Sequence, residues 1–183
     1  VVDYGNIPDS FEDTLEAFRK AARKSDLIIT SGGISVGEAD YTKRAVDSLG
    51  SMQMWRIAVK PGKPVGKGSV LGVPFIGLPG NPVSGFVTFL LFAQPLILRL
   101  SGRNQVDVKG YMLPLNFDLK GGSRREFIRV RRNAEGSLEN YRTQNSAVLS
   151  SCTWADGLAD IPAEAQLKKG DLVRYIPFSE FNL

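Results

Sequence analysis

The chain has 183 residues, a net charge of +4 and 43% hydrophobic residues, enough to form a core in one large or two small domains. It has no histidine and a single cysteine, Cys152, which excludes internal disulfides, the usual zinc sites and His-dependent nucleophiles. Any bound metal must therefore use oxygen ligands, which favours magnesium-like ions. The charge suits an anionic small molecule and is too weak to indicate nucleic acid. Nothing supports an oxidising compartment, so we expect a cytoplasmic protein.

The first half of the chain alternates predicted strands and helices. Residues 1–7 predict a strand, and residues 10–26 predict a helix with Ser10 as its N-cap. A short apolar strand at 26–30, a helix at 39–50 and two further strands at 52–59 and 73–79 follow. This alternation predicts an α/β domain over residues 1–104, with a mostly parallel sheet in three α/β/α layers.

A long apolar stretch, residues 83–100, follows Pro82. It contains Gln94, Pro95 and Arg99, and its unbroken apolar part is shorter than the roughly 20 residues of a membrane span. We therefore expect a buried core helix and no membrane partner.

From Lys109 onwards, short strand patterns without a long helix predict a small β domain over residues 105–183. The arginines between residues 124 and 132 have no aromatic stacking platform beside them, so we expect no nucleic acid.

Three loops follow three of the predicted strands. They are SGGISVG at 31–37, KPGKP at 60–64 and GLPGNP at 77–82. Ligands of α/β sheets bind beyond the carboxyl ends of the strands, so we expect the three loops to converge on one cleft.

The glycine loop lets backbone N–H groups approach an anion, although a tight strand–helix turn would use the same glycines. Lys60 and Lys63, with Arg56 upstream, can hold phosphate or another oxyanion, although most turn lysines are only solvated. We expect replacement of Lys60 to leave folding nearly intact, because a surface lysine contributes little to stability.

Two aspartates lie close to these loops in the sequence. Asp40 ends the glycine loop and Asp9 follows the first predicted strand, so either can bind magnesium or act as an acid–base group. The alternatives are a helix cap for Asp40 and an ordinary turn acid for Asp9.

Together the three loops resemble the molybdopterin molybdenumtransferase family, the MoeA and gephyrin E-domain proteins. The stretches SRREFIRV, SAVLSS and ADGLADIP extend the resemblance through the second half of the chain. It implies the C-terminal portion of such a protein, namely an incomplete molybdopterin-binding α/β domain related to the pterin adenylyltransferases, followed by the family's last β domain. It also implies a homodimer, a possible contact with the molybdopterin adenylyltransferase, and little activity for this chain alone.

The resemblance implies insertion of molybdenum from molybdate into adenylated molybdopterin, with release of AMP and with Mg²⁺ as cofactor. It implies catalytic roles for Asp9, Asp40, Lys60 and Lys63, with Asp9 and Asp40 as the metal ligands. Arg56 stands where close relatives carry lysine. The implied substrate-binding residues are Ser31, Gly32, Gly33, Ser35, Arg56, Pro79, Gly80, Asn81, Pro82, Ser84, Arg129 and Ser146.

Two other functions fit the same residues. One is the adenylation step itself, since the α/β fold is shared, and it would need ATP and the free pterin. The other is a non-catalytic binding or scaffold role, as in the gephyrin relatives. The sequence does not distinguish molybdate from tungstate.

Overall fold

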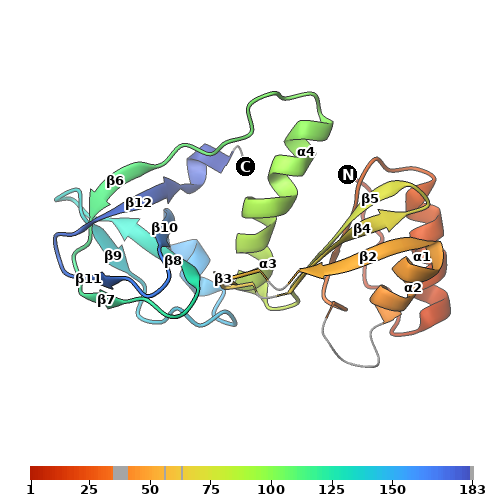
Figure 1. Cartoon of the computed structure of the whole chain (residues 1–183), viewed down its shortest axis with the longest axis horizontal. Helices are drawn as coiled ribbons and strands as arrows, with labels where there is room; N and C mark the ends of the chain where they lie inside the picture. Colours follow the sequence, from red (N-terminus) through yellow and green to blue (C-terminus); the bar gives the residue numbers. More distant parts are fainter. Residues whose placement is uncertain (35–40, 56, 63, 182–183) are drawn as a thin grey trace.

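The computed structural model describes residues 1–34, 41–55, 57–62 and 64–181. Two bodies flank one long helix, shown in green in Figure 1. The N-terminal body and the helix contain α1 (Phe11–Ala22), β1 (Ile28–Ser31), α2 (Tyr41–Leu49), β2 (Gly50–Trp55), β4 (Val65–Val70), β5 (Val73–Leu78), α3 (Pro82–Thr88), a π-helical turn (Phe89–Ala93) and α4 (Gln94–Leu100).

The sheet of the N-terminal body has the strand order β1-β5-β4-β2. β1 and β5 are parallel, but β4 is antiparallel to both of its neighbours, so the expectation of a mostly parallel sheet is wrong. The physical reason is the connection between β4 and β5, because Leu71 and Gly72 make a two-residue turn and a parallel pair needs a crossover of a dozen residues. Both turn residues have positive φ, as primed hairpin turns require.

Strand β4 was not expected from the sequence, because its glycines and lysine are typical of a loop. The glycines are required by close packing, since a Cβ on Gly68 would lie 2.1 Å from the carbonyl oxygen of Ser51 in β2. Residues 1–7 show the opposite error, because a strand was expected and none forms. They line the same cavity as the edge strand β1 but pair with no strand.

Helices cover both faces of this sheet, which confirms the three-layer α/β/α expectation. α1 and α2 pack on one face, where Phe18 and Val46 contact Val70 and Phe75. On the other face, Ala93 of the long helix packs against Ile76 and Leu78 of β5 and Val65 of β4. Helix α1 begins as expected, since Ser10 Oγ accepts the Asp13 N–H at 3.1 Å.

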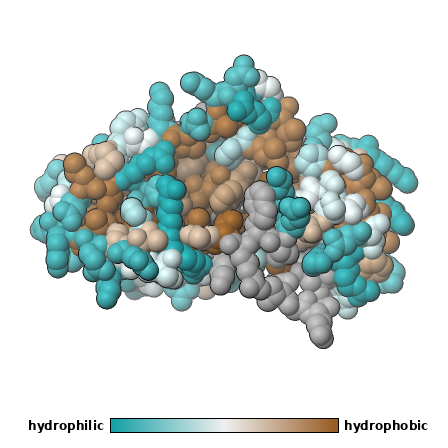
Figure 2. Space-filling view, in the orientation of Figure 1, coloured by the Kyte–Doolittle hydropathy of each residue, from teal (hydrophilic) through white to brown (hydrophobic). Residues whose placement is uncertain are grey.

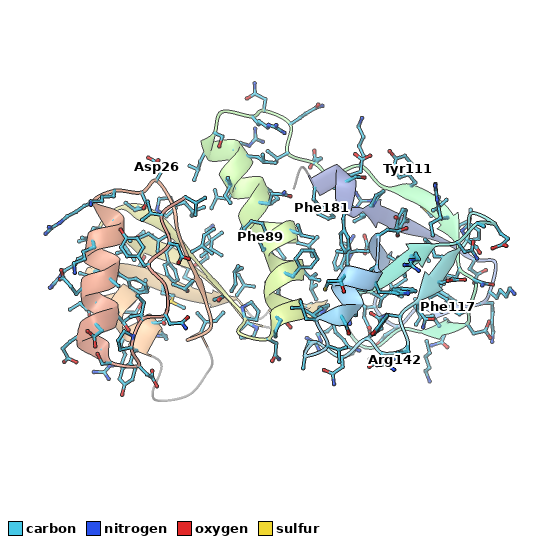
Figure 3. The ribbon with its side chains drawn as sticks, turned by 180° about the vertical axis from the view of Figure 1, so that it is seen from behind. Asp26, Phe89, Tyr111, Phe117, Arg142 and Phe181 are labelled. Carbon is cyan, nitrogen blue, oxygen red and sulfur yellow. The ribbon has the colours of Figure 1, made fainter. Side chains whose placement is uncertain are left out.

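The helical stretch from residue 82 to 100 also contacts the second body. Val83, Val87 and Leu90 pack against Phe127 and Leu158 of the β domain. On the face shown in Figure 2, hydrophobic residues gather in the centre, and Figure 3 labels Phe89 in this helix and Phe181 in the 3-10 turn near the C-terminus. By length and composition the stretch would also suit a membrane span, and less than half of it is buried. Its packing against two sheets favours the core-helix interpretation.

The second body is a small β domain, as expected. Its elements are β6 (Tyr111–Pro114), β7 (Leu119–Lys120), β8 (Arg125–Arg132), β9 (Leu138–Asn140), α5 (Ser150–Trp154), β10 (Gly157–Ile161), β11 (Gln166–Leu167), β12 (Leu172–Pro177) and a 3-10 turn (Phe178–Phe181). The main sheet has the order β3-β8-β10-β12-β6, with β9 also paired to β8, and its core includes Ile128, Val130 and Tyr175.

Strand β3 (Val59–Lys60) comes from the N-terminal half of the chain but pairs in parallel with β8 of the β domain. The single strand expected at 52–59 is therefore divided between β2 and β3, which belong to different sheets. The domain boundary between residues 104 and 105 stays a prediction.

Candidate functional site

The glycine loop and the proline loop leave the N-terminal sheet from one edge, whereas the KPGKP loop follows β3 of the other sheet. β1 and β5 end together, with Ser31 paired to Leu78. β2 points the same way because β4 runs against both of its neighbours, and Trp55 at the end of β2 pairs with Val65. The shared edge was expected from a parallel sheet, and it holds here because the one reversed strand lies between β2 and β5.

The glycine loop and the proline loop meet at this edge. The Gly32 N–H donates to the Leu78 carbonyl at 3.0 Å, and a Cβ on Gly80 would lie 3.4 Å from Gly32 Cα. Gly32 and Gly33 both have positive φ, which favours glycine. A Cβ on Gly33 would collide with Thr42, whereas a Cβ on Gly32 would meet none of the described residues within 4 Å. Tight packing thus explains Gly33, whereas Gly32 has space where a Cβ would lie but has already given its N–H to the Leu78 carbonyl.

A cavity of about 650 Å³ lies beside the glycine loop. Its lining includes Asp9, Ser31 and both glycines, and also Asp3. The Thr30 hydroxyl of the same wall is buried and has no hydrogen-bond partner among the described residues. The hydroxyl and carboxylate residues in its lining can give this cavity the donors and acceptors that a polar ligand requires.

Magnesium fits this lining. Mg²⁺ is usually held by one or two carboxylates together with water and substrate phosphates, and Asp9 and Asp3 both line the cavity, with Asp3 Oδ1 already accepting the Gly5 N–H at 2.8 Å. The part of the chain that the structure describes contains no group of three or more Asp, Glu, Cys or His residues that would form an all-protein metal cage. Asp40, the second expected ligand, lies outside the described residues, as do Ser35, Arg56 and Lys63.

Lys60 lies on β3 and is bound to the β domain. Its Nζ is 3.1 Å from Glu126 Oε2, and the other oxygen of Glu126 accepts the Gly122 N–H at 3.0 Å. Glu126 is 8% exposed, whereas the Lys60 side chain is 48% exposed, so the ammonium group lies between a buried carboxylate and solvent. Neither Lys60 nor the proline loop is among the described residues that line the cavity, so the expectation that the three loops converge on one cleft is not confirmed. Glu126 was not expected from the sequence, where it stands unmarked beside two arginines.

The turn after Lys60 packs on the long helix. Pro61 and Gly62 are buried, and the Lys60–Pro61 peptide bond is cis. Gly62 has a φ of 114°, and a Cβ there would lie 2.3 Å from Thr88 Cγ2 in α3. The lysine turn and the proline loop are therefore both fixed to α3.

The proline loop contacts the β domain at the start of α3. The Val83 N–H donates to the Ser146 carbonyl at 3.2 Å, and Asn81 Nδ2 lies 3.4 Å from Ser146 Oγ. Gly80, Asn81 and Pro82 are exposed, whereas Pro79 is buried. Ser84 is 5% exposed inside the helix packing, so its side chain is not open to a ligand in this structure.

Arg129, expected near the cleft, is buried beneath the segment that carries Ser146. Only 1% of its surface is exposed, and its guanidinium donates to Ser151 Oγ and to the Asn145 carbonyl. Burial lowers the pKa of this guanidinium below its usual range. Arg129 is therefore a packed internal cation and does not present its charge at an open surface.

The fold and these loops define a protein in which an α/β body with a cavity beside its glycine loop is joined by one helix to a small β domain. Residues 1–99 match the model of a probable molybdopterin binding domain, and residues 113–178 match the MoeA C-terminal region, domain IV. The chain belongs to this molybdopterin-binding family, which includes the MoeA and gephyrin proteins.

Named relatives agree with this assignment. A molybdopterin molybdenumtransferase of Haemophilus influenzae is 50% identical over 105 residues, which cover 57% of this chain and 26% of the relative. A putative molybdopterin biosynthesis protein of Methanocaldococcus jannaschii is 33% identical over 172 residues, 93% of this chain and 41% of the relative. The crystal structure of a MoeA protein from Pyrococcus horikoshii superposes with a TM-score of 0.76 at 30% identity, over 93% of this chain and 41% of that one. The chain thus spans between about a quarter and two fifths of the length of these relatives.

Proposed function

We propose that the chain is the molybdopterin-binding and C-terminal portion of a molybdopterin molybdenumtransferase. The proposed reaction inserts molybdenum from molybdate into adenylated molybdopterin and releases AMP. The observation that carries this proposal is the close approach of the glycine loop to the proline loop, through the hydrogen bond from Gly32 to Leu78, at one sheet edge beside the cavity lined by Asp9. The names of the relatives support the same reaction class.

The geometry suggests how the substrate would be held. Phosphate oxygens would lie close to Gly32, where no Cβ obstructs them, although the Gly32 N–H itself already donates to the Leu78 carbonyl. The exposed side of the Lys60 ammonium would supply positive charge for molybdate or phosphate oxygens. Cleavage of the phosphoanhydride builds negative charge on the AMP leaving group, and donors placed in advance lower the energy of that state.

A divalent cation belongs to the same proposal. Bound Mg²⁺ would supply charge neutralisation at the phosphates, and Asp9 would hold it, with Asp40 as the second proposed ligand. Lys63, Arg56 and Ser35 keep the substrate-binding or catalytic roles implied by the family resemblance. A homodimer, a contact with the adenylyltransferase and a cytoplasmic location are further parts of the proposal.

The reaction is tested in the longer protein that contains this chain. Purified protein is incubated with adenylated molybdopterin and magnesium, and AMP release is measured with and without molybdate. The proposal expects AMP release that depends on molybdate, with tungstate as a second oxyanion. Consumption of ATP in the presence of free molybdopterin would instead assign the adenylation step. Absence of both reactions would favour the non-catalytic role.

A further inference from the structure

Residues 143–148 of the β domain contact the start of α3. The first N–H groups of a helix have no partner within the helix. One of these donors, the Val83 N–H, is satisfied by the Ser146 carbonyl at 3.2 Å, and Asn81 reaches the Ser146 hydroxyl. The position of Ser146 therefore bears directly on the position of the proline loop.

Gln144 fastens this segment to β8. Its side-chain Oε1 accepts the Arg129 N–H at 2.9 Å, and its Nε2 donates to the Arg129 carbonyl at 3.1 Å. These two bonds satisfy the backbone N–H and carbonyl of Arg129, as a residue of a neighbouring antiparallel strand would do. On this edge of β8, strand β3 pairs only as far as Glu126 and β9 pairs only from Val130. Gln144 fills most of the gap between them, and the Tyr141 N–H also donates to the Arg129 carbonyl at 3.4 Å.

The Arg129 side chain also binds this segment through hydrogen bonds. Its Nη2 donates to the Asn145 carbonyl at 3.3 Å and its Nε to Ser151 Oγ at 3.1 Å. Within the described part of the chain, no carboxylate forms an ion pair with it. A buried charge is costly unless it is hydrogen-bonded, so the compensation for burying Arg129 comes from the segment between residues 145 and 151.

We propose that Gln144 is a positioning residue that, together with Arg129, holds Ser146 against the first turn of α3 and so sets the position of the Pro79–Pro82 loop. Gln144 was not among the site residues expected from the sequence. The expected effect of Gln144 on catalysis rests on the proposed function, whereas its role in holding Ser146 against α3 does not.

The structural part is tested by amide hydrogen exchange in the 183-residue chain, followed residue by residue by NMR. In Gln144→Ala both bonds to Arg129 are lost, and we expect exchange at Val83 to rise roughly ten-fold while Val87, deeper in the same helix, is unchanged. Gln144→Glu keeps an acceptor for the Arg129 N–H and loses the donor, so we expect a smaller rise.

Two control variants separate this effect from a general loss of stability. Gln166→Ala removes an exposed glutamine from β11 of the same domain and should leave exchange at Val83 unchanged. Ser146→Ala retains the carbonyl that accepts from Val83, so it should change Val83 exchange by less than about two-fold. Unchanged exchange at Val83 in both Gln144 variants overturns the proposal, as do equal rises at Val83 and Val87. If Gln144→Ala fails to fold, exchange at Val83 in Gln144→Glu decides.

The catalytic part is tested in the longer protein. For Gln144→Ala we expect the KM for adenylated molybdopterin to rise roughly ten-fold while kcat changes by less than about two-fold, because a misplaced loop weakens substrate binding. A fall in kcat at constant KM contradicts this. If the unmodified protein shows no molybdate-dependent AMP release, the proposed function fails, while exchange at Val83 still decides whether Gln144 positions the segment.

Discussion

Lys60 and Glu126 are register partners on the parallel strands β3 and β8, and their side chains form an ion pair with 3.1 Å between Nζ and Oε2. A lysine expected to serve the substrate is thus also the cation that neutralises a nearly buried carboxylate of the β domain. Because β3 leaves the N-terminal half of the chain to pair with β8, this ion pair joins the lysine turn to the second body.

Lys60→Ala should therefore lower the free energy of unfolding by about 1–3 kcal/mol, because it leaves the Glu126 carboxylate buried without its cation. This differs from the sequence-based expectation of nearly intact folding. Urea unfolding measures the change, and Lys24→Ala at an exposed position of the N-terminal body is the control. Adding Glu126→Gln to Lys60→Ala should restore most of the loss. Equal stability of Lys60→Ala and the wild type would show that the ion pair contributes nothing.

Gly62→Ala tests whether the lysine turn is packed on α3. The new Cβ would lie 2.3 Å from Thr88 Cγ2 at a residue with positive φ, so overpacking of about 1–3 kcal/mol adds to the backbone strain. Gly72→Ala is a matched control, because Gly72 also has positive φ but its Cβ would enter open space. Thermal unfolding should rank Gly62→Ala clearly below Gly72→Ala. Equal melting temperatures would mean that α3 does not constrain the turn.

Asp9→Asn tests the proposed magnesium site. Asp9 is exposed, so the change should alter the free energy of unfolding by less than about 0.5 kcal/mol. In the longer protein, the magnesium concentration that gives half-maximal AMP release should rise at least about ten-fold. Asp26→Asn, an exposed acid outside the cavity lining, serves as the control (Figure 3). Coincident magnesium curves for Asp9→Asn and the wild type would remove Asp9 from the metal ligands.

Tyr175 gives the β domain a dependence on alkaline pH. Burial is the largest cause that raises the pKa of its phenol, followed by the hydrogen bond that it donates to Asp156 Oδ1 at 2.7 Å. The unfolded chain should release this proton near pH 10, whereas the folded chain retains it. The free energy of unfolding should therefore fall as the pH rises above about 10.

Tyr175→Phe removes this titrating group. At neutral pH it should cost about 0.5–1.5 kcal/mol for the lost hydrogen bond, and above pH 10 its stability should decline less steeply than that of the wild type. Urea unfolding at several pH values measures both the loss of stability at neutral pH and the decline of stability above pH 10. Parallel declines of the two proteins above pH 10 would assign the alkaline loss to other groups.

Local patterns in the sequence predicted much of the fold. The Ser10 cap set the start of α1, and short β-branched runs marked β1, β5 and β8, because capping and side-chain periodicity act between residues close in the chain. The same reasoning failed for β4, whose glycines are explained only by the close approach of β2. It failed also for residues 1–7, because a strand needs a paired partner to form.

The sequence by itself determined the family, the layered α/β domain followed by a β domain, and the meeting of the glycine loop and the proline loop at one edge of the sheet. The tertiary structure alone decided which sheet β3 joins, that Glu126 binds Lys60, that Arg129 is buried, and that Gln144 closes the edge of β8. Lys60 and Glu126 are 66 positions apart in the numbering (126 − 60), and no local periodicity links residues at that separation. Such contacts exist only after the long helix has brought the two sheets together, so the partners of the site residues depend on packing and not on local sequence.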